Sequence, residues 1–64
     1  MLEDELDDFI RVLKGQQKDN YCFYVGRDYR EDALIIEHYR GHDVVFHPLL
    51  DDDAVIFAPK QNWN

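Results

Sequence analysis

The sequence predicts an α+β fold in which an N-terminal amphipathic helix packs on a small antiparallel β-meander of three or four strands. Two patterns support this fold class: apolar residues recur at helical spacing near the N-terminus, and short β-branched and aromatic runs fill the rest of the chain. All three glycines fall between these segments, where turns and helix ends favour them. Residues 1–64 contain no linker and no repeat, so we expect one small domain.

The expected helix covers residues 2–14. Leu2, Leu6, Phe9 and Leu13 are spaced by three or four residues and form one apolar stripe. Acidic residues crowd the first turns, basic residues occupy the last turn, and a glycine follows directly. This arrangement suits the helix dipole and gives the helix a C-terminal stop.

Four strands are expected after the helix, each of them rich in β-branched or aromatic residues. They cover residues 21–25, 33–39, 43–47 and 54–57. Gly41 marks a tight turn whose two-residue loop is either Arg40-Gly41 or Gly41-His42. Residues 59–64 are the expected tail, which includes Trp63.

The second expected strand is apolar on both sides, because Ala33 to Ile36 form an unbroken apolar run. A strand that is covered on one side only should alternate apolar and polar residues. With either loop at Gly41, Leu34, Ile36 and Val45 share the face opposite Ile35 and Val44. A helix of this size is about 20 Å long and covers one face of the sheet, not both.

We therefore expect a second copy of the chain or another protein to cover the second face. Its expected contacts on the sheet are Leu34, Ile36, Val45 and Ile56, because soluble monomers seldom expose large apolar patches. Two alternatives need no partner: Trp63 and the tail fold back over this face, or a β-bulge turns some of these residues away.

Charge limits the class of partner. The chain has 14 acidic and 7 basic residues and a net charge of −7, which argues against direct binding to nucleic acid or anionic lipid and favours a basic protein surface.

No apolar run is long enough for a membrane span, and the N-terminus is acidic where a signal peptide is basic. A single cysteine, Cys22, favours a reducing compartment, so we expect a cytoplasmic protein.

The acidic face of the helix is a candidate partner surface. Glu3 with Asp7, and Asp4 with Asp8, are like-charge pairs four residues apart, which repel each other. In size and charge the chain is similar to small phage or mobile-element inhibitors that mimic DNA, such as inhibitors of uracil-DNA glycosylase, although no motif of such a family is present. This resemblance implies that the acids, with Asp51–Asp53, occupy a DNA-binding site on a host protein. The alternative is a solvated helix N-terminus.

A loop after the first strand is the second candidate surface. Arg27, Tyr29 and Arg30 lie in it, and residues of these two types are enriched in protein-binding hot spots. We therefore expect this loop to contribute to partner binding.

We expect neither a metal site nor a cofactor. His38, His42, His47 and Cys22 are the only soft-metal ligands, and their spacing matches no zinc motif. Whether His38 and His47 approach each other depends on the loop at Gly41. Asp51–Asp53 lack the EF-hand spacing and fit an exposed turn. In a sheet, Cys22 fits a core position.

The leading interpretation is a non-enzymatic protein-binding module, that is, an inhibitor, an adaptor or a regulatory subunit, with a homodimer as the expected assembly. A DNA-mimic inhibitor is the alternative, and a small metal-binding or enzymatic protein is third. Serine and threonine are absent, which removes the hydroxyl nucleophiles of that type. No motif of a phosphate-binding loop or a nucleophile elbow is present.

Overall fold

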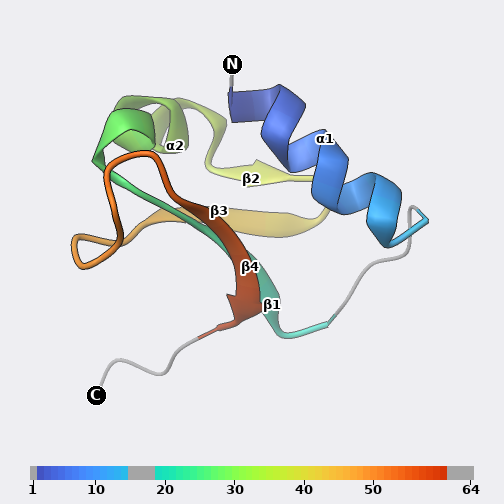
Figure 1. The fold of residues 1–64 in the computed structure, drawn as a ribbon. Helices are drawn as coiled ribbons and strands as arrows, with labels where there is room; N and C mark the ends of the chain where they lie inside the picture. The colour runs from blue at the N-terminus through green and yellow to red at the C-terminus, as the bar shows by residue number, and fades with distance from the viewer. Residues whose placement is uncertain (1, 15–18, 61–64) are drawn as a thin grey trace.

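A computed structural model describes residues 2–14 and 19–60 of the chain. In these residues, two α-helices lie on one side of a four-stranded sheet (Figure 1), which confirms the predicted α+β class. The elements in chain order are α1 (Leu2–Val12), β1 (Tyr21–Val25), the 3₁₀ helix η1 (Arg27–Tyr29), α2 (Arg30–Ile36), β2 (His38–Tyr39), β3 (His42–Phe46) and β4 (Val55–Pro59).

Helix α1 forms where the apolar stripe predicts it. Leu2 and Leu6 are buried against the sheet, while acidic residues occupy the first turn and a basic residue the last. The helix was expected to reach residue 14 but ends at Val12. The chain closes a tight turn there, because the Lys14 N–H donates to the Arg11 carbonyl at 3.0 Å and Lys14 has a φ of 57°.

The sheet is mixed, with strand order β2-β3-β1-β4. Strand β4 pairs antiparallel with β1, and β2 pairs antiparallel with β3, but β1 and β3 run parallel. The expected all-antiparallel meander is therefore wrong. Parallel neighbours need a crossover connection, and η1 and α2 provide it on the side of the sheet that also carries α1 (Figure 1).

Residues 33–39 were expected to form a strand, but the first half of this segment is helical. Helix α2 takes Arg30–Ile36, and only His38–Tyr39 remain extended as β2. Ala33 is buried and Ile36 packs against the core, so residues three apart present one helix face to the sheet. A short apolar run fits a buried strand or a helix equally well, and here the packing of Ala33 and Ile36 selects the helix.

The turn between β2 and β3 uses Arg40 and Gly41, one of the two loops that the sequence predicts. Tyr39 pairs with His42 across it. Arg40 and Gly41 have φ values of 53° and 83°, and a two-residue hairpin of type I′ requires positive φ at both positions.

The remaining strands lie within two residues of their expected ends. Residues 21–25 are β1 as predicted, whereas the strands expected at 43–47 and 54–57 are found at His42–Phe46 and Val55–Pro59.

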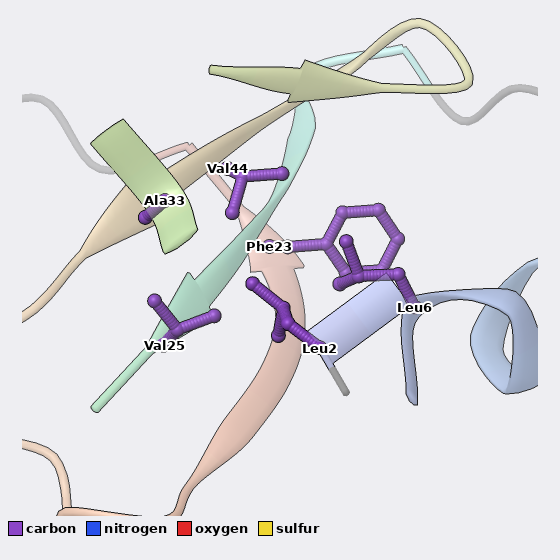
Figure 2. Close-up of a cluster of buried hydrophobic side chains, with 6 residues drawn as sticks. All are labelled: Leu2, Leu6, Phe23, Val25, Ala33 and Val44. Atoms are coloured by element: carbon purple, nitrogen blue, oxygen red, sulfur yellow. The ribbon is translucent and has the colours of Figure 1, made fainter. Parts of the chain in front are cut away.

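The core lies between the two helices and the sheet. Figure 2 shows its six buried side chains converging from α1, α2, β1 and β3: Leu2, Leu6, Phe23, Val25, Ala33 and Val44. His42 is also buried on this side, and its ring meets the rings of Phe23 and Phe57 edge-on, at centroid distances of 5.9 and 5.0 Å. Its imidazole therefore belongs to an aromatic cluster in the core.

The opposite face of the sheet, here called the open face, carries neither α1 nor α2 (Figure 1). Side chains alternate along a strand, so the residues that do not point to the helices define this face. On β1, β3 and β4 these residues are Cys22, Tyr24, Asp43, Val45, Ile56 and Ala58. Val45 and Ile56 are the strand partners of Tyr24 on its two sides, so the three residues form one row across the sheet.

Candidate protein-binding site

A cleft opens between the start of α1 and the outer side of α2. It encloses about 160 Å³ and is lined by Leu2, Glu3, Asp32, Ile35 and Ile36, which define the α1–α2 cleft. Three of these side chains are apolar and two are carboxylates. Because both carboxylates belong to exposed residues, the cleft combines an apolar floor with a negative rim.

Helix α2 also carries exposed apolar side chains, and one of them, Ile35, lines the cleft. Ala33 and Ile36 take the inner face of this short helix, so Leu34 and Ile35 are turned outward and are 69% and 80% exposed. Two large apolar residues that are adjacent in the sequence and this exposed, one of which lines the cleft, are typical of a protein contact surface. Leu34 was expected on a sheet face, and Ile35 was not among the predicted contact residues.

Acidic residues from several elements gather near the start of α1. Tyr29 of η1 forms a hydrogen bond with the Glu5 carboxylate, and the negative charges of Glu5, Asp53 and Asp28 also act on it. The hydrogen bond to Glu5, followed by loss of solvent and these charges, raises the pKa of Tyr29 to about 12. With Glu3 and Asp32 at the cleft, this end of the molecule carries acids from α1, η1, α2 and the β3–β4 loop.

The four acids of α1 that were predicted to bind a partner differ in their surroundings. Glu3 lines the α1–α2 cleft, and Asp4 is exposed. Asp7 is half-buried and accepts a hydrogen bond from the Tyr39 hydroxyl, which raises the pKa of Tyr39. Asp8 forms an exposed ion pair with Arg11 at 3.6 Å. Asp7 therefore ties α1 to β2, and Glu3 is the member that joins an apolar surface.

The structure separates the four apolar residues that were expected to share one face of the sheet. Leu34 and Ile36 lie on α2, with Ile36 partly packed in the core. Val45 and Ile56 do lie on the open face and are 37% and 40% exposed. The shared face was inferred from a strand at 33–39, and it is wrong because that segment is helical up to Ile36.

The open face is partly covered by its own polar side chains. Lys60, which follows β4, and Asp43 of β3 form an ion pair at 3.1 Å, and they flank β1 on its two sides. Tyr24 is buried, with its ring 5.8 Å from that of His47 and its hydroxyl 3.4 Å from the Pro59 carbonyl. The exposed apolar area is thus concentrated at Val45 and Ile56. Trp63, the predicted cover, lies outside the described residues.

The arginines of the predicted loop surface have contacts of their own. Arg27 lies 3.9 Å from the Asp52 carboxylate, and the Arg30 guanidinium lies over the Phe46 ring at 5.7 Å. Tyr29, between them, packs against the core. Both arginines remain exposed, so they are accessible to a partner, whereas Tyr29 chiefly joins η1 to α1.

The candidate metal ligands are spread over the fold. His42 is in the core, Cys22 and His47 lie toward the open face, and His38 pairs with Asp43 in the hairpin. Within residues 2–14 and 19–60, no group of three or more histidine, cysteine or acidic side chains is placed to hold a metal ion.

Sequence reasoning missed three residues of the cleft: Leu2, Asp32 and Ile35. For Asp32 and Ile35 the signal was present in the spacing of residues 30–36, where acids occupy the first turn and Ala33 and Ile36 repeat at i, i+3. That spacing is also helical.

Comparisons with known proteins add no relationship: no family model, no curated protein and no solved structure matches this chain. Among the described residues, each helix is too short or too polar to cross a membrane.

Proposed function

We propose that this chain is a non-enzymatic protein-binding module whose α1–α2 cleft receives an apolar side chain from a basic segment of another protein. The proposal depends on one observation: apolar and acidic side chains line the same cleft. Leu2 and Ile36 form its floor, Ile35 is exposed beside them, and Glu3 and Asp32 form its rim. In this role the module is an inhibitor, an adaptor or a regulatory subunit.

Hydrophobic burial supplies the affinity in this proposal. Covering an exposed isoleucine or leucine is worth about 1.5–3 kcal/mol, and Leu34 and Ile35 are both available. Two apolar residues alone give weak binding, so further contacts around the cleft are needed for a stable complex.

Charge supplies the selectivity. The net charge is −7, and the rim of the cleft carries the carboxylates of Glu3 and Asp32. Lysine or arginine beside the docking apolar residue therefore accelerates association and excludes acidic partners.

The size of the cleft supports a side chain as its occupant. Its volume of about 160 Å³ is below the roughly 300–1,000 Å³ of sites for small molecules. The absence of serine and threonine from the sequence removes one class of nucleophile as well. The single cysteine is buried and free, which favours the cytoplasm as the compartment in which the module works.

The test uses two β-branched apolar residues with nearly equal exposure. Ile35 on α2 and Val12 on α1 are 80% and 81% exposed, so Ile35→Asp and Val12→Asp each add one charge to a solvent-facing helix surface. The probe is a synthetic amphipathic peptide of leucine and lysine, and binding is followed by NMR amide shifts of the labelled protein. We expect shifts centred on residues 2, 3 and 32–36, and at least about tenfold weaker binding for Ile35→Asp than for Val12→Asp. Equal binding by the two variants would contradict the proposal.

A DNA-mimic inhibitor remains the alternative, because four elements contribute acids to one end of the molecule. That function rests on charge alone, so binding to a basic DNA-binding protein should collapse between about 50 and 300 mM salt. Ile35→Asp should leave such a complex intact, whereas Glu3→Lys and Asp32→Lys should weaken it. Retained affinity at high salt, together with loss in Ile35→Asp, favours the apolar cleft instead.

A further inference from the structure

Strand β4 is an edge of the sheet in the described part of the chain, because the strand order ends with it. Its pairing with β1 fixes which of its backbone groups are not bonded to β1. The Gly26 N–H donates to the Ala54 carbonyl at 2.9 Å, and the Lys60 N–H donates to the Asn20 carbonyl at 2.7 Å. Antiparallel pairs alternate between hydrogen-bonded and non-bonded positions, so the backbone groups of Val55 and Phe57 point away from β1.

Pro59 follows the same alternation. It lies at a position whose N–H would also point away from β1, so proline, which has no N–H, fits there without loss of a bond to β1. A partner strand therefore finds donors and acceptors at Val55 and Phe57 and a missing donor at Pro59.

The two ends of this edge carry opposite charges. The acidic turn Asp51–Asp53 precedes β4, and Lys60 follows it. If two copies of β4 run antiparallel about Ile56, Val55 of each copy lies opposite Phe57 of the second copy. The same register sets Lys60, whose amine pairs with Asp43 within its own chain, near Asp52 of the second copy. It leaves Pro59 opposite Asp53, beyond the paired strand residues.

We propose that a second copy of this chain docks on β4, with the two β4 strands antiparallel and centred on Ile56. Val55 and Phe57 of the two copies exchange backbone hydrogen bonds, and the Ile56 side chains meet on the open face. The register satisfies the free backbone groups, complements the end charges and keeps Pro59 out of the ladder. A register centred on Phe57 would place Pro59 opposite Val55, where its missing N–H would cost a hydrogen bond.

The test separates edge pairing from stacking of two open faces. Val45 and Ile56 lie in the same row on the open face with exposures of 37% and 40%, but only Ile56 lies on the edge strand. Sedimentation equilibrium of the full chain is measured at about 150 mM salt for the parent, Ile56→Lys and Val45→Lys. We expect a concentration-dependent dimer that Ile56→Lys weakens at least about tenfold and Val45→Lys leaves within about twofold.

A backbone variant covers the case in which Ile56→Lys fails to fold. The chain is short enough for synthesis from segments 1–21 and 22–64 joined at Cys22, which allows an N-methyl group on Val55. This group removes only an outward N–H, so circular dichroism should stay unchanged while dimerisation weakens. A parent chain that stays monomeric up to about 1 mM overturns the proposal, as does an unaffected dimer of the N-methyl chain. Equal weakening by the two lysine variants also overturns it, because that result indicates stacking of the open faces.

Discussion

Gly26 lies directly against the main chain of Asp51: a Cβ at position 26 would be 1.9 Å from the Asp51 carbonyl oxygen. The contact closes the β3–β4 loop onto the end of β1. The loop is held by the Gly26 N–H, which donates to the Ala54 carbonyl, and by the Asp28 N–H, which donates to the Asp52 carbonyl, both at 2.9 Å. This contact holds the acidic turn beside η1, where Asp53 acts on Tyr29.

Gly26→Ala should therefore lower the free energy of unfolding by at least about 2 kcal/mol, because the backbone must move to admit the methyl group. Urea denaturation followed by circular dichroism measures the loss. Gly41→Ala is the control: it meets a positive φ of 83°, which costs about 1 kcal/mol. A loss in Gly26→Ala no larger than that in Gly41→Ala would contradict the close approach.

Leu6 and Val12 lie on the same helix and test which face of α1 stabilises the fold. Leu6 is fully buried and Val12 is 81% exposed. Leu6→Ala should lower the free energy of unfolding by about 2–5 kcal/mol through lost burial and a residual cavity. Val12→Ala should change it by less than about 0.5 kcal/mol. Similar losses in the two variants, measured by thermal and urea unfolding, would show that α1 does not pack as described.

The raised pKa of Tyr29 leads us to expect that the protein loses stability in alkaline solution. Its pKa is raised from 10.0 to about 12, first by the hydrogen bond to Glu5, so the folded chain keeps the hydroxyl proton over a range in which the unfolded chain loses it. The folded state then binds more protons, and stability falls as the pH rises from about 10 towards 12. Below pH 10 this contribution is fully present.

The measurement is the free energy of unfolding at about pH 8 and about pH 11 in the parent and in Tyr29→Phe. We expect a smaller decline in the variant, because phenylalanine has no proton to lose. Absorbance of the phenolate provides a second readout: Tyr29→Phe should remove a titration step near pH 12. An identical decline in both proteins would exclude the Tyr29–Glu5 hydrogen bond as its source.

The hairpin between β2 and β3 offers a stabilising substitution. Arg40 has a φ of 53°, which asparagine adopts more readily than other residues with a side chain. Arg40→Asn should raise the free energy of unfolding by about 0.5–1 kcal/mol, reduced in part by loss of the contact between the guanidinium and the Tyr39 ring at 5.9 Å. Arg40→Ala loses the same contact and gains nothing, so it should be less stable than the parent. The opposite order of the two variants would rule out strain at residue 40.

Residue spacing and turn preferences in the sequence correctly predicted the elements that are determined by residues close together in the chain. The stripe of Leu2 and Leu6 identified α1, the aromatic run at residues 21–25 identified β1, and Gly41 marked the hairpin turn. Each of these features depends on spacing or backbone preference within a few residues. The ends moved by two residues or fewer, because helix and strand termini depend on weak local contacts.

The apolar run from Ala33 to Ile36 shows where local signals were insufficient. A helix of seven residues is not stable alone, so its formation depends on contacts of Ala33 and Ile36 with the core. Those contacts arise from residues distant in the chain. The α1–α2 cleft was missed for the same reason, because Leu2 and Ile35 meet only after the chain has folded.

The sequence alone determined an acidic α+β domain with an N-terminal helix, one free cysteine and a net charge of −7. The tertiary structure decided that β1 and β3 run parallel, that α2 forms and that His42 enters the core. The difference has a physical cause. Charge and periodicity are properties of neighbouring residues, whereas strand order and the fate of an ambiguous apolar run follow from how distant segments share one small core.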